Sequence, residues 1–277
     1  MKPFAQHARS YLFVPANRTE RFEKALNTAA DAVIIDLEDA VPADLKHAAR
    51  ESLSLWLQAH PEYQVMIRIN ARQSKWFQDD QNLLQFANVM AIVLPKTESA
   101  ADIQAVTAIR ALDIYALIET PRGLAQVREI AATASVKALM FGSIDFQLEM
   151  DMQGGYHELL AFRNEIVLAS KLAGIQAPID GVTVDFKDEA LIELETHQAK
   201  NLGFGGKLCI HPNQVALVNQ TFSPTAEELE WAHRVLHAEA QAAGQAVSLD
   251  GKMIDLPVIL KAKKLLQQAA LNVKQAQ

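Results

Sequence analysis

The feature of the sequence that most constrains the fold is an alternation of short apolar runs with longer segments of helical periodicity. Eight runs of strand length are strand candidates, at residues 10–14, 32–37, 65–69, 90–94, 114–119, 138–142, 177–181 (the weakest) and 207–210. Helices are expected at residues 19–29, 43–59, 76–86, 100–111, 123–134, 157–173, 187–201 and 213–220. Alternating strands and helices are typical of βα units around a parallel sheet.

Eight such units favour one particular α/β architecture, the (β/α)8 TIM barrel. The first expected strand is not followed by a glycine-rich nucleotide-binding fingerprint, which a doubly wound sheet of the dinucleotide-binding type would carry. We therefore predict a TIM barrel, with a doubly wound sheet as the alternative.

The pattern changes after Ser223-Pro224, where two extra C-terminal helices without intervening strands are expected at 226–243 and 256–272. The segment 244–255, GQAVSLDGKMID, joins them. This part is too short for an independent core. The sequence thus predicts a barrel domain over 1–222 and a helical extension over 223–277.

Composition and charge exclude several classes of protein. Half of the 277 residues are apolar, 21% are charged, and the net charge is −7, which argues against nucleic-acid or anionic-membrane partners. No run of about 18 apolar residues and no signal peptide is present, so we expect a cytoplasmic protein without a membrane span. The single cysteine, Cys209, excludes an intramolecular disulfide and argues against a cysteine-ligated zinc site.

Two carboxylates end neighbouring strand candidates. Glu119 closes the fifth in ALIETPRGL, and Asp145 follows the sixth in FGSIDF. The carboxyl ends of barrel strands carry the chemistry of this fold, and Mg²⁺ usually takes one or two protein carboxylates. The pair is therefore a candidate magnesium site. The alternative, to which we give equal weight, is that each acid caps the helix that follows it or pairs with a surface lysine.

Two cations lie near other strand ends. Arg68, in IRIN, is suited to clamp a substrate carboxylate, and a salt bridge to a neighbouring acid is the equal alternative. Lys96, in LPKTES, could bind phosphate or form a Schiff base, but beside a pair of metal-binding carboxylates we favour a structural or anion-steadying role.

His233 and His237 lie four residues apart on an expected helix and fit a solvated helix face better than a metal site.

Eight stretches of the chain, in their order and spacing, resemble the aldolase/citrate lyase family, and in particular the citrate lyase beta subunit and its stand-alone acyl-CoA lyase relatives. The stretches are RSYLFVPANRTERFEKA, ADAVIIDLEDAV, RINA, LPKTES, ALIETPRGL, FGSIDF, GKLCIHPNQ and DGKMIDLPV. The resemblance implies a (β/α)8 barrel with extra C-terminal helices, assembled as a homotrimer or hexamer.

The resemblance also implies roles for single residues. The metal-binding acids of the family correspond to Glu119 and Asp145, and its carboxylate-binding arginine corresponds to Arg68. The aspartate of its C-terminal motif corresponds to Asp255, which reaches the active site of a neighbouring subunit in relatives and is a catalytic acid/base candidate. We further expect Gly142 and Ser143, within FGSIDF, to contact the substrate together with Arg68 and Glu119.

Coenzyme A contacts follow from the same resemblance. Relatives bind this cofactor through an aromatic residue after the first strand and nearby basic residues, which correspond to Phe13, Arg18 and Lys24. Ile210 and His211 match a further cofactor-contacting segment. Ordinary helix-surface charge is the alternative for Arg18 and Lys24. The chain resembles the stand-alone type, which acts on free CoA thioesters rather than on a carrier protein.

The expected function is a Mg²⁺-dependent carbon–carbon lyase. It would cleave a 3-hydroxy-carboxyacyl-CoA, such as citramalyl-CoA, malyl-CoA or a citryl thioester, into acetyl-CoA or a similar thioester and a 2-oxo acid. One alternative is a malate synthase-like condensation of acetyl-CoA with glyoxylate followed by thioester hydrolysis. Another is a non-catalytic protein that binds CoA or an organic acid.

Overall fold

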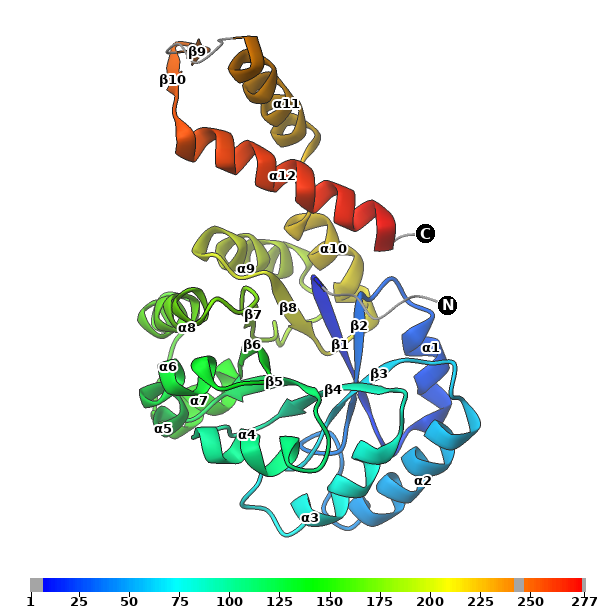
Figure 1. The fold of residues 1–277 in the computed structure, drawn as a ribbon. Helices are drawn as coiled ribbons and strands as arrows, with labels where there is room; N and C mark the ends of the chain where they lie inside the picture. Colours follow the sequence, from blue (N-terminus) through cyan, green and yellow to red (C-terminus); the bar gives the residue numbers. More distant parts are fainter. Residues whose placement is uncertain (1–6, 242–246, 276–277) are drawn as a thin grey trace. The chain divides into compact units, whose positions relative to one another are not determined.

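The computed structural model describes residues 7–241 and 247–275, and the chain divides into two compact units, with the boundary in the sequence between Phe222 and Ser223. The first unit is a closed barrel whose eight parallel strands follow one another in chain order, with the first strand paired to the last (Figure 1). This topology confirms the predicted TIM barrel and excludes the doubly wound sheet.

The barrel strands are short and largely buried. They are β1 (Ser10–Pro15), β2 (Ala32–Asp36), β3 (Val65–Arg68), β4 (Val89–Leu94), β5 (Asp113–Ile118), β6 (Val136–Phe141), β7 (Ile179–Asp180) and β8 (Gly206–Cys209). The weakest candidate, 177–181, shrinks to the two residues of β7. Gly181 follows it at a close approach, since a Cβ there would lie 2.4 Å from Ser143 Oγ.

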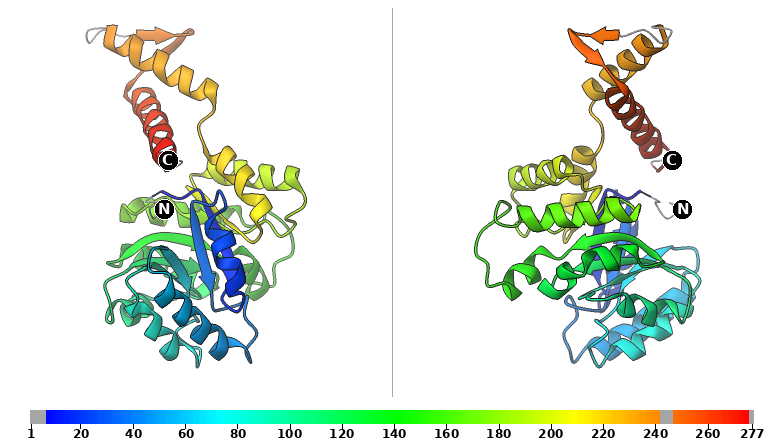
Figure 2. Two further views of the ribbon diagram at one scale, coloured as in Figure 1. Left: turned by 90° about the vertical axis from the view of Figure 1, so that its right-hand side faces the viewer. Right: turned by 60° about the vertical axis from the view of Figure 1, so that its left-hand side comes forward.

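Helices surround the barrel on its outside (Figure 2). They are η1 (Thr19–Arg21), α1 (Phe22–Leu26), α2 (Lys46–Ala59), α3 (Phe77–Asp80), η2 (Gln81–Gln85), α4 (Ala100–Thr107), α5 (Pro121–Ala125), α6 (Val127–Ala132), α7 (Ser143–Glu149), α8 (Leu160–Ala173), α9 (Glu189–Leu202) and α10 (Pro212–Phe222). The single helix expected over 123–134 is interrupted at Gln126, whose φ of −104° departs from helical geometry. The short α7 was not expected, because seven residues carry too little periodicity to stand out.

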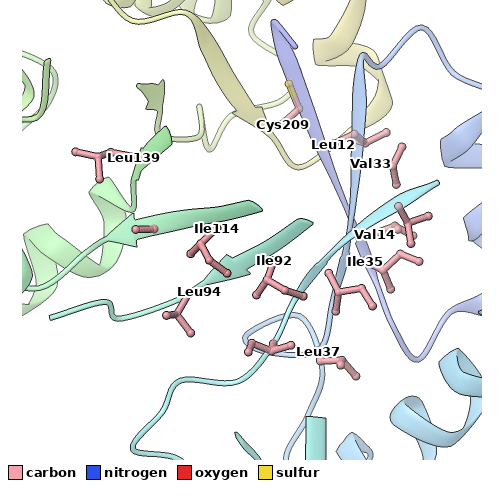
Figure 3. Packing of buried hydrophobic residues seen from close by; sticks show 14 of the residues in the cluster. Leu12, Val14, Val33, Ile35, Leu37, Ile92, Leu94, Ile114, Leu139 and Cys209 are labelled. Carbon is pink, nitrogen blue, oxygen red and sulfur yellow. The ribbon is translucent and has the colours of Figure 1, made fainter. Parts of the chain in front are cut away.

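Alternate strand residues pack on opposite sides of the barrel wall, so the strand sequences are apolar throughout. Tyr11 and Tyr115 lie in the inner cluster, with ring centroids 5.8 Å apart. Leu12, Val33 and Ile92 belong to the outer cluster, between strands and helices (Figure 3). Burying each such aliphatic side chain contributes roughly 1.5–3 kcal/mol, so this double packing fixes the strand ends that carry the polar residues.

The second unit contains α11 (Ala226–Gln241), a hairpin of β9 (Val247–Leu249) and β10 (Lys252–Ile254), and α12 (Leu256–Gln275). The hairpin replaces the plain connection expected over 244–255, and its turn places Asp250 and Gly251 at φ of 51° and 75°, as an Asp-Gly hairpin turn requires. The unit has a small apolar cluster of its own around Ala232, Val235, Ala262 and Leu265. The expected helix end at 242–243 and residues 244–246 lie outside the described residues.

None of the helices in the described ranges combines the length and the apolar character that crossing a membrane would need. This finding agrees with the absence of a long apolar run in the sequence.

Candidate active site

The carboxyl ends of the barrel strands enclose a cavity of about 300 Å³. Its polar lining includes Asp36, Asp39, Arg68, Glu119, Ser143 and Asp145. An apolar wall completes it, formed by Phe13, Leu117, Phe141, Val182, Leu208 and Ile210. The cavity thus lies where TIM barrels carry their active sites, and it brings together the two predicted metal ligands and the predicted carboxylate clamp.

Arg68 is the last residue of β3 and lies in register with Asp36, the last residue of β2. Its Nε and Nη2 donate to the two oxygens of the Asp36 carboxylate at 2.7 and 2.5 Å. Paired charge-assisted hydrogen bonds of this kind are strong and fix the plane of the guanidinium. The salt-bridge alternative for Arg68 is therefore observed, on a side chain that also lines the cavity.

The third nitrogen of Arg68 is less constrained. Nη1 lies 3.2 Å from Glu38 Oε2 and 3.7 Å from Asp39 Oδ2, and within the described ranges no hydrogen bond engages it. The Phe13 ring covers the guanidinium, with 4.7 Å from Cζ to the ring centroid. Burial alone would lower the pKa of Arg68, but the adjacent carboxylates raise it above its ordinary value, so the group stays cationic.

Glu119 directly follows β5 and is 1% exposed. Its Oε1 accepts a hydrogen bond from the backbone N–H of Lys96 at 2.8 Å. Its Oε2 lies on the side of Gly142, where an added Cβ would approach within 2.5 Å of that oxygen and 2.4 Å of the Glu119 Cβ. Glycine at position 142 thus makes room for the carboxylate, and among the described residues only its Oε1 has a hydrogen-bond partner.

Lys96 follows β4, and its ammonium is directed at the same carboxylate. Its φ of +46° is a backbone conformation that residues other than glycine rarely adopt. Such a residue costs of order 1 kcal/mol and persists where its surroundings fix it. Thr97 supplies part of that support, because its Oγ1 donates to Leu94 O at 2.7 Å and its N–H donates to Leu117 O at 3.3 Å. The strained turn aims both the N–H and the ammonium of Lys96 at buried acids.

The site carries an excess of buried negative charge. Burial, followed by the charge of Glu38, raises the pKa of Glu119 from 4.5 to about 8, although the nearby ammonium and guanidinium groups act in the opposite direction. Burial likewise raises the pKa of Glu38 to about 7, against the effect of Arg68. A bound divalent cation would offset this cost of ionising both groups.

Asp145 lies in the first turn of α7 and lines the same cavity as Glu119, whose pKa it helps to raise. Two carboxylates form a hard oxygen donor set, and Mg²⁺ commonly completes its octahedron with water and substrate oxygens. In residues 7–241 and 247–275, no three His, Cys, Asp or Glu side chains gather as a metal-binding group. The donors present therefore fit a magnesium ion with open positions better than a closed structural site.

The remaining substrate and cofactor candidates divide into two groups. Gly142, Ser143, Phe13 and Ile210 all line the cavity. Arg18, Lys24 and His211 do not: Arg18 forms an exposed ion pair with Glu20 at 2.6 Å, Lys24 is exposed on α1, and the His211 ring stacks on Phe186 at 4.5 Å.

Asp255 belongs to the second unit, between β10 and α12. It is exposed, and its Oδ1 accepts a hydrogen bond from the N–H of Val258 at 3.2 Å, as an N-terminal helix cap does. Its predicted catalytic role stays a prediction.

Sequence reasoning did not assign functional roles to Asp36 and Glu38, which contact Arg68. The signal that could have found them is the run IDLEDA, in which a buried strand ends in a cluster of acids. Buried acids in such a run need cationic partners, and Arg68 and Lys96 were the cations at neighbouring strand ends.

The fold and this site define a class, the TIM-barrel proteins that carry a carboxylate pair and an arginine at the carboxyl ends of their strands. Within that class, residues 9–212 match the HpcH/HpaI aldolase/citrate lyase family, and residues 164–272 match a family described as C–C bond lyases of the TIM-barrel fold. The chain belongs to the HpcH/HpaI aldolase/citrate lyase family, which confirms the resemblance seen in its motifs.

Relatives within the family have differing names. The chain is 37% identical to a citrate lyase subunit beta-like protein of Deinococcus radiodurans, covering 95% of this chain and 97% of that protein. It is 35% identical to a (3S)-malyl-CoA thioesterase of Cereibacter sphaeroides, covering 94% of each.

Among solved structures, the chain is similar to CitE from Mycobacterium tuberculosis in complex with magnesium, acetoacetate and coenzyme A. The TM-score is 0.84 at 34% identity, covering 96% of this chain and 99% of that one. A citrate lyase beta subunit from the same organism, complexed with oxaloacetate and magnesium, gives a TM-score of 0.70 at 33% identity, covering 79% and 99%.

Proposed function

We propose that this protein is a Mg²⁺-dependent carbon–carbon lyase that cleaves a 3-hydroxy-carboxyacyl-CoA into acetyl-CoA, or a similar thioester, and a 2-oxo acid. The observation that carries the proposal is that Glu119, Asp145 and Arg68 line one cavity at the carboxyl end of the barrel. A carboxylate pair for a hard cation beside a fixed guanidinium suits the carboxylate and neighbouring oxygen of a 2-oxo acid.

Glu119 and Asp145 would hold the metal ion. When bound there, magnesium supplies Lewis-acid polarisation and a counter-charge for the oxygen on which negative charge develops. Arg68 adds a fixed positive charge beside it, because Asp36 orients the guanidinium in advance. Nη1, the nitrogen without a hydrogen bond among the described residues, is the one we assign to the substrate carboxylate.

Cleavage also requires that the hydroxyl loses its proton and that the thioester enolate gains one. We propose Asp255 of a neighbouring subunit for one of these transfers, in a homotrimer or hexamer. In this arrangement residues 1–222 form the catalytic barrel, and the extension 223–277 completes the adjacent site. The support for this arrangement is the family match, which continues into the extension up to residue 272.

For the coenzyme A part of the substrate, we propose that Phe13 and Ile210, with Gly142 and Ser143, contact the thioester end, since all four line the cavity. Arg18, Lys24 and His211 are proposed for the distal part of the cofactor. The exposure of Arg18 and Lys24 is what binding the phosphates of a soluble cofactor would require.

Thioester hydrolysis is a second candidate, favoured by the 35% identity to a malyl-CoA thioesterase. One experiment separates the two. Citramalyl-CoA, malyl-CoA and citryl-CoA are each incubated with the protein and Mg²⁺, and both the 2-oxo acid and the free CoA thiol are followed.

A lyase releases 2-oxo acid and leaves the thioester of acetyl-CoA intact, whereas a thioesterase releases free thiol without 2-oxo acid. In a separate incubation with acetyl-CoA and glyoxylate as substrates, release of free CoA would indicate the synthase-like reaction. Absence of turnover with every thioester would contradict an enzymatic role and favour a binding protein.

A further inference from the structure

The Lys96 ammonium lies between two buried glutamates, Glu38 and Glu119. Lys96 Nζ donates a hydrogen bond to Glu38 Oε1 at 3.1 Å. The same nitrogen lies 3.8 Å from Glu119 Oε1, which is an ion-pair distance but too long for a hydrogen bond. Lys96 is thus shared unequally, and Glu38 holds it more closely than Glu119 does.

Glu38 is itself held in place. Its backbone N–H donates to Asp36 Oδ1 at 2.8 Å, and its second carboxylate oxygen lies 3.2 Å from Arg68 Nη1. It is 7% exposed, so solvent contributes little to satisfying its charge. Glu38 therefore stands between the two cations of the site, Arg68 and Lys96.

The result is a row of alternating charges from four consecutive strand ends. It runs from Asp36 through Arg68, Glu38 and Lys96 to Glu119. Each cation has an acid on both sides. Neutralising the central acid therefore changes what each of the two cations pairs with.

We infer that Glu38 is a positioning residue that keeps the Lys96 ammonium away from Glu119, so that the Glu119 carboxylate stays available to a divalent cation. The inference rests on the proposed metal site. Without a carboxylate at position 38, Glu119 becomes the nearest buried acid to the ammonium. A rotation of the Lys96 side chain then suffices to pair its ammonium with Glu119. The ammonium and the metal ion would then compete for the same carboxylate.

The test is a double-mutant cycle on divalent-cation affinity. Mn²⁺ replaces Mg²⁺ as the probe, and free Mn²⁺ is measured by electron paramagnetic resonance with wild type, E38Q, K96M and E38Q/K96M. Removing a partner that orients a metal ligand typically weakens affinity 10–100-fold, which is the loss expected for E38Q. In the K96M background, E38Q should change affinity by less than about 3-fold, because no ammonium remains to compete.

The cycle distinguishes positioning from simple loss of charge. If E38Q acts only by removing a negative charge near the metal, it weakens binding by the same factor with or without Lys96, and this result overturns the inference. D39N serves as the comparison, because it removes a charge from the same loop without removing the hydrogen-bond acceptor of Lys96. The charge of Asp39 also acts on Lys96, so D39N should depend on the background, but less than E38Q does.

A second variant keeps the charge constant. E38D withdraws the carboxylate by one methylene and should weaken Mn²⁺ binding in the presence of Lys96 but not in K96M. Unchanged affinity in E38D with Lys96 present would contradict the inference. Circular dichroism and thermal unfolding of each variant verify the fold.

Failure of the inference and failure of the proposed function give different results. If E119Q leaves Mn²⁺ affinity unchanged, the metal lies elsewhere and both fail. If E119Q abolishes binding while E38Q acts equally in both backgrounds, only the inference fails. If the cycle behaves as expected but no thioester is cleaved, the positioning role stands and the lyase assignment fails.

Discussion

Asp36 and Arg68 occupy the ends of adjacent strands in direct register, and two hydrogen bonds of 2.7 and 2.5 Å join the carboxylate to one edge of the guanidinium. Backbone pairing and side-chain pairing therefore coincide at one place. The orientation of the guanidinium is determined before a substrate enters the cavity.

This relationship predicts that lysine cannot replace Arg68. An ammonium keeps the charge but cannot form the two-pronged pair with Asp36, so its direction is no longer fixed. R68K should lower kcat/KM for the preferred thioester by about 10²–10³-fold, the loss usual for an oriented charge-stabilising group. Steady-state kinetics measure this loss, and Mn²⁺ affinity should change much less. Near-normal kcat/KM in R68K would contradict the role assigned to the pair.

Gly142 should tolerate no side chain. An added Cβ would lie 2.4 Å from Glu119 Cβ and 2.5 Å from its Oε2, so G142A must displace the carboxylate. We expect overpacking to cost about 1–3 kcal/mol of stability and Mn²⁺ affinity to fall at least 10-fold. G155A is the matched control, because nothing lies within 4 Å of its added Cβ. Equal Mn²⁺ affinity in the two variants would show that Gly142 does not set the position of Glu119.

Glu119 should make the metal-free protein less stable as pH rises. Its pKa is about 8 in the folded, metal-free protein against 4.5 as the ordinary value, so folding takes up a proton between these pH values. The free energy of unfolding then decreases with pH across that window. E119Q cannot ionise, so its melting temperature in EDTA at pH 8.5 should exceed that of wild type by at least about 2 °C. Parallel pH profiles for the two proteins would contradict the assignment.

The cavity should prefer a 2-oxo acid half that has one carboxylate. Considering the described residues that line it, Arg68 is the only cation. The second carboxylate of a citryl substrate would face acids or the apolar wall without a partner, whereas the methyl group of citramalyl-CoA is compatible with that wall. We expect kcat/KM for citramalyl-CoA to exceed that for citryl-CoA at least 10-fold. V182K adds a cation to the wall and should narrow this ratio; an unchanged ratio would contradict the argument.

The repeating architecture was predictable from the sequence because barrel strands buried on both sides read as continuous apolar runs. The predicted strands 32–37 and 90–94 illustrate this, since they correspond to β2 (Ala32–Asp36) and β4 (Val89–Leu94) to within one residue at each end. The two-residue β7 gave a weak signal, since so short a strand cannot show a period. The break between α5 and α6 at Gln126 could not be predicted from the sequence either, because glutamine is an ordinary helix former.

The candidate site was only partly predictable. Strand ends identified Glu119, Asp145 and Arg68 as neighbours, because parallel strands converge at one edge. The sequence could not show that Lys96 adopts φ of +46°, or that its ammonium is nearer to Glu38 than to Glu119. Those distances depend on side-chain packing between strands that are far apart in the chain.

The apolar wall and the row of charges come from different parts of the barrel. The row is built on the ends of β2 to β5, whereas most of the wall lies elsewhere, with Phe13 on β1, Phe141 on β6, Val182 after β7 and Leu208 on β8; Leu117 on β5 is the exception. Phe13 contacts the Arg68 guanidinium, but substitutions at Val182 or Leu208 can alter which acyl group fits while the charged residues remain unchanged. For a gene under selection, this separation lets the substrate preference of the proposed lyase change through single substitutions in that part of the wall.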